Sequence, residues 1–226
     1  MRERAKLLGR EAFACAKQGT LILLAKRGGA RAAPEGDRVV AFVHGYGAAG
    51  AVFEPLRRRV EERFEVATID FTYRSSWAFP RIVEGLAGAL DAVADRGARI
   101  DIVGHSLGGL LSRWYVQELG GAAHVDRLVT LATPHAGTAS ARLMPGPLRD
   151  ALLPDNPVVR RLRSGRARAE GVVHTALVAG SDLMVTPPAS AAAVADADVR
   201  WFDGLGHNAM LFDPHVHEAV LAALDS

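Results

Sequence analysis

The chain has little cysteine, with Cys15 alone among its 226 residues. One thiol cannot form a disulfide within the chain, and no cluster of cysteines and histidines has the spacing of a zinc site. A run of about 18 apolar residues is also lacking, so no segment is predicted to span a membrane. The net charge of +2 gives no reason to expect a nucleic-acid partner. We therefore expect a protein with no disulfide, metal or cofactor.

The N-terminus is basic but has no apolar segment long enough for a secretion signal. Lys17 and Gln18 interrupt the sequence before the short apolar run Leu21–Leu24. We therefore predict a cytoplasmic or membrane-peripheral protein in which residues 1–27 form a basic amphipathic helix, followed by a linker to residue 36. The helix is expected to pack on the main domain, and contact with an anionic membrane surface is the alternative. The residues expected to make this packing are Leu7, Leu8, Phe13 and Leu21.

Residues 37–226 alternate between apolar, β-branched runs and segments with helical periodicity. This order predicts an α/β domain with about six mostly parallel strands and helices on both faces of one sheet. Ligands of such sheets bind at the carboxyl ends of the strands. The expected strands are residues 39–43, 66–69, 100–103, 128–131, 172–178 and 199–202, and the expected helices are residues 52–64, 80–94, 110–119 and 210–224.

Residues 138–170 interrupt the alternation with four prolines and several grouped leucines. An insertion of this length is usually functional or disordered, and the grouped apolar residues favour a small helical cap or lid over the site. A solvated loop is the alternative. If its apolar side chains line a groove, long acyl chains fit, and if they bury against the sheet, short acyl chains fit better. These side chains are Leu143, Met144, Leu148, Leu152 and Leu153.

The segment Gly104-His105-Ser106-Leu107-Gly108 lies between a predicted strand and a predicted helix. This pattern is typical of a nucleophile elbow, in which a strained turn holds a serine toward a base on one side and a substrate on the other. Glycines beside the serine remove Cβ atoms that would collide in such a turn. A structural junction with a capping serine is the alternative. The pattern predicts Ser106 as a nucleophile.

A serine nucleophile needs a base to take its proton and an acid to orient that base. After an elbow serine, the acid is expected first in the chain and the histidine second. His207 lies in a glycine-flanked loop between the last predicted strand and helix, which makes it the candidate base. His215 and His217 fall within the closing helix and are expected to be exposed.

Asp182 is the candidate acid because it follows Gly180 at the carboxyl end of a predicted strand. Asp203 is the competitor, although its position four residues before His207 is typical of a turn residue. Asp196 and Asp198 flank the last strand and are expected to be solvated. The oxyanion of the reaction needs two backbone donors, and the amides of Leu107 and Tyr46 are the candidates.

Several short motifs, taken together and in order, resemble the small bacterial triacylglycerol lipases and esterases of the α/β-hydrolase superfamily. The likeness covers roughly residues 38–226. It implies Ser106 as nucleophile, Asp182 as acid and His207 as base, with the amides of Tyr46 and Leu107 as the oxyanion hole. It also implies that His135 belongs to a structural strand-end motif. The motifs are residues 42–47, 104–109, 133–138, 180–182 and 206–207.

These features predict a serine hydrolase of carboxylic esters, a lipase or esterase that works through an acyl-enzyme and takes an ester or lipid substrate. A thioesterase with the same machinery is one alternative. A non-catalytic binding module on the hydrolase fold is the other, since a fold does not fix a function. Peripheral contact with a membrane or lipid interface is a further expectation, based on the basic N-terminus.

Overall fold

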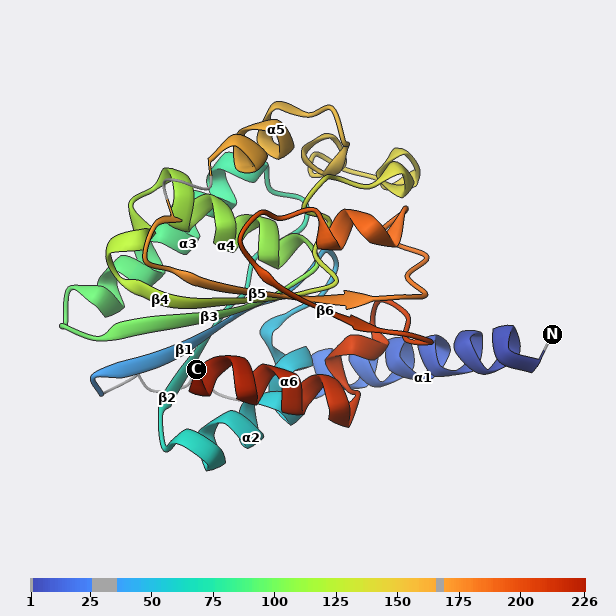
Figure 1. Ribbon diagram of the computed structural model, residues 1–226, viewed down its shortest axis with the longest axis horizontal. Coiled ribbons are helices and arrows are strands. Elements are labelled where there is room, and N and C mark those ends of the chain that lie inside the picture. Colours follow the sequence, from blue (N-terminus) through green and yellow to red (C-terminus); the bar gives the residue numbers. More distant parts are fainter. Residues whose placement is uncertain (1, 26–35, 166–168) are drawn as a thin grey trace.

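The computed structural model describes residues 2–25, 36–165 and 169–226. Six strands form one fully parallel sheet in the order β2-β1-β3-β4-β5-β6 (Figure 1). The predicted α/β class with six parallel strands is therefore confirmed. The strands are β1 (Arg38–Val43), β2 (Ala67–Phe71), β3 (Arg99–His105), β4 (Val125–Leu131), β5 (Val173–Ala179) and β6 (Asp198–Phe202).

Helices cover both faces of the sheet (Figure 1). Helices α3 (Phe79–Ala94), α4 (Leu107–Glu118) and α5 (Pro157–Ser164) lie on one side, and α2 (Glu54–Phe64) and α6 (Pro214–Asp225) lie on the other. Neighbouring β1 residues face opposite layers, so that Val39 and Ala41 join one apolar core while Val40 and Phe42 join the other. Burial on both faces is the reason that these strands read as continuous apolar runs.

Short 3₁₀ helices (η) account for the differences at two of the predicted helices. The predicted helix 52–64 begins as η1 (Gly50–Phe53), and the predicted helix 210–224 is divided into η7 (Ala209–Leu211) and α6. Asp213 causes that division, because its carboxylate accepts the amides of His215 and Val216 and so starts a new helix. Further 3₁₀ helices among the described residues are η2 (Gly121–Ala123), η3 (Ala139–Leu143), η4 (Asp150–Leu152) and η6 (Pro188–Ala192).

The N-terminal helix, α1 (Arg2–Ala25), packs on the domain on the same side as α6 (Figure 1). The prediction for its contacts is only half right. Leu7 and Leu21 are partly buried, whereas Leu8 and Phe13 are 52% and 68% exposed. The innermost described side chain of the helix is instead the small Ala14, which allows close approach to the domain. The linker predicted after this helix falls mostly on residues 26–35, which lie outside the described residues.

The strand order reverses between β1 and β3, which lie side by side at the middle of the sheet. Val43, the last residue of β1, pairs with Gly104 of β3. In open parallel sheets the loops that leave two such strands diverge and make a crevice at their carboxyl ends. Gly45 and Ser106 follow these two strands, so the topology places both of them at that crevice.

Candidate active site

Ser106 is the single residue between β3 and α4, and its backbone is strained. Its φ of 55° and ψ of −123° are unusual for a residue with a side chain. Two backbone hydrogen bonds hold the turn, since the Ser106 amide donates to Leu131 O at 2.9 Å and Ser106 O accepts from the Gly109 amide at 3.1 Å. The turn directs Ser106 into a cavity, as expected for a nucleophile elbow.

Glycines let α4 start in contact with the ends of two strands. A Cβ added at Gly108 would lie 2.0 Å from Val43 O, and one at Gly104 would lie 2.7 Å from the Cα of Gly109. Both distances are far inside van der Waals contact with backbone atoms, which cannot rotate away as a side chain can. Residues without a Cβ are therefore required at both positions for the elbow to close.

The variant Gly108→Ala is expected to destabilise the protein by several kcal/mol, about 3 or more, because the new methyl group overlaps the Val43 carbonyl. Gly88→Ala is the matched control, since Gly88 lies on α3 with nothing within 4 Å of an added Cβ. The control should raise stability by about 0.5–1 kcal/mol through helix propensity. Urea unfolding of both variants measures the difference, and equal stabilities would contradict the close approach.

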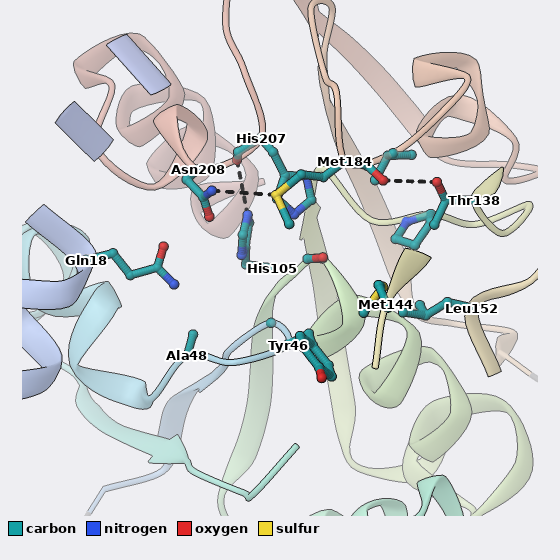
Figure 2. A pocket seen from close by; sticks show the side chains of 14 residues that line it. Gln18, Tyr46, Ala48, His105, Thr138, Met144, Leu152, Met184, His207 and Asn208 are labelled. Atoms are coloured by element: carbon teal, nitrogen blue, oxygen red, sulfur yellow. Dashed lines mark hydrogen bonds between the residues drawn. The ribbon is translucent and has the colours of Figure 1, made fainter. Parts of the chain in front are cut away.

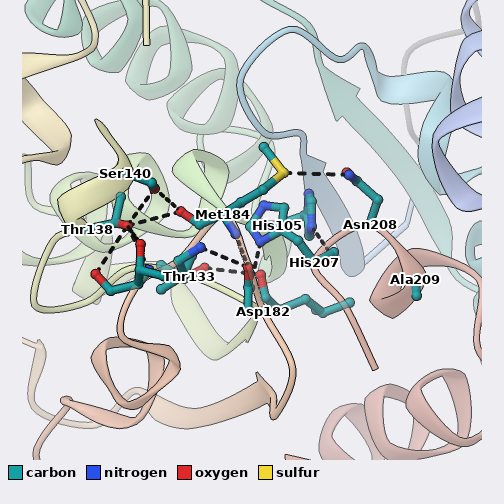
Figure 3. A network of polar contacts seen from close by, with 12 residues as sticks. His105, Thr133, Thr138, Ser140, Asp182, Met184, His207, Asn208 and Ala209 are labelled. Carbon is teal, nitrogen blue, oxygen red and sulfur yellow. Dashed lines mark hydrogen bonds and ion pairs between the residues drawn. The ribbon is translucent and has the colours of Figure 1, made fainter. Parts of the chain in front are cut away.

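His207 and Asp182 are brought together from 25 positions apart in the chain. His207 Nδ1 lies 2.7 Å from Asp182 Oδ2, and the two side chains are only 3% and 2% exposed. The other carboxylate oxygen, Oδ1, accepts the amides of Met184 at 2.7 Å and Val185 at 2.8 Å (Figure 3). The carboxylate is thus fixed by its own loop and leaves one oxygen for the imidazole.

The competing acids are not buried with His207. Asp203, Asp196 and Asp198 are all exposed, and Asp198 pairs with Arg200 within β6. His215 is exposed as expected, but the same expectation for His217 is wrong. His217 is 4% exposed, and its ring lies 2.8 Å from the Leu211 carbonyl, because η7 folds back over the start of α6.

Ser106 and His207 line the same cavity, together with Gly45 and Tyr46 (Figure 2). Among the described residues no hydrogen bond joins Ser106 to His207, and such contacts in unliganded enzymes often tighten only when substrate binds. The cavity has a volume of about 40 Å³. That space suits a few water molecules, so an extended acyl chain requires the wall side chains to move.

The wall of the cavity opposite His207 comes partly from the predicted cap, residues 138–170. Met144 and Leu152 line the cavity, whereas Leu148 is fully buried and Leu143 is 90% exposed. The apolar residues of the segment therefore divide between the two alternatives, since some line the cavity and one is fully buried. The segment is divided between η3, η4 and α5, and each short helix turns a different side chain inward.

The candidate oxyanion donors lie on either side of Ser106. Leu107 is the first residue of α4, where an amide has no carbonyl one turn earlier to bond. The Tyr46 amide belongs to the peptide unit whose carbonyl is that of Gly45. This loop lies against the serine, since a Cβ added at Gly45 would be 3.0 Å from the Cβ of Ser106. Both amides are thus available near the serine hydroxyl.

His44 holds the Gly45–Tyr46 peptide, a contact that the sequence did not reveal. Its Nε2 accepts the Tyr73 amide at 3.2 Å, so Nδ1 carries the proton and donates to Gly45 O at 2.7 Å. The ring also stacks on Tyr73, with centroids 4.3 Å apart. Since the carbonyl and amide of one trans peptide point in opposite directions, fixing Gly45 O also fixes the direction of the Tyr46 N–H.

Burial lowers the pKa of His44 from 6.5 to about 4. The unfolded chain therefore binds a proton that the folded chain refuses between these two pH values, and stability falls as the pH is lowered through this window. The contribution of His44 reaches about 3 kcal/mol at the acid end. Urea unfolding from pH 7 to pH 4 should show this loss in the free energy of unfolding of the parent. The free energy of His44→Asn should depend less on pH, and the Asn amide can still donate from near the position of Nδ1. His215→Asn controls for the substitution, and equal slopes for His44→Asn and the parent would contradict the assignment.

His105 supports the histidine loop from beneath. Its Nε2 lies 3.2 Å from the His207 carbonyl oxygen, and the two rings are 4.7 Å apart. Burial, together with the nearby His207 ring, holds the pKa of His105 well below its usual range, so the ring is neutral and Nε2–H donates to that carbonyl. The residue before the nucleophile is therefore a structural partner of the candidate base.

His135 lies in a buried polar chain away from the cavity, in agreement with the structural role implied by the sequence resemblance. Its Nδ1 is 3.0 Å from Arg113 Nη1, and its Nε2 is 3.0 Å from Thr130 Oγ1. Arg113 also donates to Leu162 O at 2.8 Å, which ties α4 to α5. Burial and the Arg113 charge hold the pKa of His135 well below its usual value, so the imidazole serves as a neutral acceptor.

No group of three metal-ligating side chains occurs in the part of the chain that the structure describes. Within the same residues, no helix combines the length and the apolar character needed to cross a bilayer.

Comparison with known proteins adds a family and a fold. A sequence model of the palmitoyl protein thioesterase family matches residues 39–192, which is more than half of the chain. No curated protein matches the sequence. Many solved structures share the fold, including lipases and esterases of the α/β-hydrolase superfamily, and this bears out the resemblance found in the motifs.

Three of these structures illustrate the likeness. Lipase B of Aspergillus fumigatus is 17% identical, with a TM-score of 0.70 over 84% of this chain, and this chain spans only 53% of its length. Lipase BlEst2 of Bacillus licheniformis, in its mature form, is 14% identical with a TM-score of 0.70, covering 87% of this chain and 96% of that one. EstE1, a thermophilic carboxylesterase from a metagenomic library, is 19% identical with a TM-score of 0.64 over 96% of both chains. At these identities the likeness establishes the α/β-hydrolase fold.

Proposed function

The chain belongs to the palmitoyl protein thioesterase family, and from that premise we propose that it is a serine hydrolase of acyl esters, with Ser106, His207 and Asp182 as its catalytic triad. One observation carries the proposal. His207 is buried beside Asp182, with 2.7 Å between Nδ1 and Oδ2, and it lines the same cavity as a serine held in a strained elbow. A nucleophile and a base in one cavity, with an acid that orients the base, are what acyl transfer requires.

In the proposed reaction each of these atoms has one role. Asp182 accepts a hydrogen bond from His207 Nδ1–H, which leaves the Nε2 lone pair free for the Ser106 hydroxyl. Nε2 takes the hydroxyl proton while Oγ bonds to the acyl carbon, and the carbonyl electrons move onto its oxygen. The Tyr46 and Leu107 amides donate to this oxyanion. The positive end of α4 adds to the stabilisation, because Leu107 is its first residue.

The tetrahedral adduct then collapses. The carbonyl re-forms, the bond to the alcohol oxygen breaks, and His207 Nε2 returns the proton to the leaving alcohol. Water repeats the sequence on the acyl-enzyme, giving its proton to His207 and releasing the carboxylic acid and the Ser106 hydroxyl. His105 lies beside His207 but does not take this proton, because burial holds the pKa of His105 well below its usual range.

A thioester is the second candidate substrate, and the family match favours it. The same steps hydrolyse a thioester with a thiol in place of the alcohol as leaving group. Rates for matched oxygen esters and thioesters of the same acid decide between the two. A higher kcat/KM for the thioester at every chain length would assign the protein as a thioesterase, and the reverse would assign it as a carboxylesterase or lipase.

Acyl-chain length is the second substrate question. The cavity of about 40 Å³ favours short acyl groups, and long chains require Met184, Met144 or Gln18 to move. Methionine adapts to such a demand because its side chain is unbranched and flexible. The rate of hydrolysis of esters with acyl chains of two to sixteen carbons tests this. If the walls are rigid, the rate should fall sharply beyond about four carbons. Sustained activity on long chains would establish that the walls open.

Contact with a lipid surface is part of the proposal and rests on exposed side chains. Leu8, Phe13 and Leu23 of α1 are at least half exposed, and basic residues lie on the same helix. Apolar and basic side chains together favour the interface of an anionic membrane. Sedimentation with anionic vesicles should capture the parent chain more strongly than Phe13→Ser. Equal capture of both, or of neither, would remove lipid contact from the proposal.

A further inference from the structure

Helix α1 lies outside residues 39–192, the part of the chain that matches the family, yet it touches the loop of the candidate base. Its contact residue is Glu11. Glu11 Oε1 accepts the Asn208 backbone amide and the Asn208 side-chain amide, both at 2.8 Å, and Oε2 accepts the Ala209 amide at 3.2 Å. Asn208 directly follows His207, so a carboxylate of the N-terminal helix holds the residue next to the candidate base.

These three hydrogen bonds form a helix cap supplied from a distant part of the chain. Asn208 is the N-cap of η7 and Ala209 is its first residue, positions where amides have no partner within their own helix. A charged acceptor at that position makes stronger hydrogen bonds than a neutral one. Glu11 therefore fixes where η7 begins and, through it, where the backbone of His207 lies.

Gly206 makes room for the carboxylate on the other side of His207. A Cβ added at Gly206 would lie 2.5 Å from Glu11 Oε2. The two neighbours of His207 in the chain thus both meet Glu11, one through hydrogen bonds and the other through close approach. Asp182 contacts the imidazole of His207 and His105 contacts its carbonyl, while Glu11 contacts the residues on either side of it.

The same face of α1 reaches the cavity itself. Gln18 lies seven residues after Glu11, which is two helical turns, and its side chain lines the cavity with Ser106 and His207 (Figure 2). The amide group of Gln18 is therefore placed to meet the substrate, while Glu11 acts on the loop behind it. Both observations make α1 part of the wall of the site.

We propose that Glu11 is a positioning residue for the base His207, and that α1 is an integral part of the active site. This inference rests on the proposed function, because it requires His207 to act as the base. A misplacement of about 1 Å in a catalytic group can cost about 100-fold in rate. Loss of Glu11 should therefore act on kcat, with little change in KM.

The test compares Glu11→Ala and Glu11→Gln in the full chain with Glu62→Gln, which removes an exposed carboxylate from α2. Activity is expressed per active site, titrated with a fluorophosphonate, so that unfolded protein does not count. Glu11→Ala is expected to lower kcat by about 10- to 100-fold, and Glu11→Gln by less, since one amide oxygen still accepts. Glu62→Gln should match the parent.

A second comparison separates positioning from general loss of stability. Gly206→Ala alone should lower kcat, because its methyl group displaces the Glu11 carboxylate. In the Glu11→Ala background that space is open, so the double variant should be no slower than Glu11→Ala itself. Additive losses, or a kcat within twofold of the parent for Glu11→Ala, would overturn the proposal. A parent chain that fails to react with the fluorophosphonate would instead overturn the proposed function.

Discussion

Replacing Ser106 with alanine is expected to lower the turnover of an ester substrate by about 10⁶-fold. The serine supplies the oxygen that bonds to the acyl carbon. Two other described hydroxyls line the cavity, and both already donate to backbone carbonyls. Thr138 Oγ1 bonds to Met184 O at 3.0 Å, and the Tyr46 hydroxyl bonds to Pro145 O at 2.8 Å. What remains should be the slow reaction of water in a site that still binds substrate. Steady-state rates on one ester, before and after the change, measure the loss.

The control for this change is Ser164→Ala, at the exposed end of α5. Its rate should equal that of the parent. Thermal unfolding of the Ser106→Ala protein should remain a single cooperative transition, which would show that lost activity does not come from lost structure. More than about one hundredth of the parent rate in the Ser106→Ala protein would be incompatible with a serine nucleophile at this position.

The second large effect is expected for Asp182→Asn, at about 10⁴-fold in kcat. The Asn oxygen still accepts the Met184 and Val185 amides, so the loop should keep its shape and present the NH₂ group to His207. His207 Nδ1 must then accept, which moves the ring proton to Nε2. An imidazole protonated there cannot take the proton of Ser106, even though every atom is close to its original place.

Asp203→Asn is the matched control, because Asp203 is the competing acid in the sequence and lies exposed near the same loop. Its kcat should stay within a few-fold of the parent. Initial rates with a single ester and circular dichroism of both variants are sufficient for the comparison. A larger loss for Asp203→Asn than for Asp182→Asn would transfer the role of acid to Asp203.

The fold was predictable because its signals are local. Strands buried on both faces give continuous runs such as Val39–Val43, and the glycines around Ser106 identify the one turn that demands close approach. Alternation of strands and helices then restricts the topology to a parallel sheet. The chain order of an elbow serine, an acid and a histidine restricts the candidates further, and Asp182 and His207 indeed lie in hydrogen-bond contact.

The contacts that the sequence analysis did not predict join distant parts of the chain, and no local pattern encodes them. Glu11 bonds to residues 197 and 198 positions later, and in the sequence it is only one charge in a basic helix. Two of the four apolar residues expected to pack, Leu8 and Phe13, lie on an exposed face of α1, and the small Ala14 packs closer than either. His44 and His217 are likewise ordinary in sequence, and only the folded chain supplies the carbonyls that bond to them.

The most direct test of the triad is mass spectrometry of the folded chain after reaction with a fluorophosphonate. The arrangement of Ser106, His207 and Asp182 predicts a single adduct on the peptide that contains Ser106, formed rapidly in the parent and far more slowly in His207→Ala. An adduct on a different residue, or a folded parent that remains unlabelled, would contradict it.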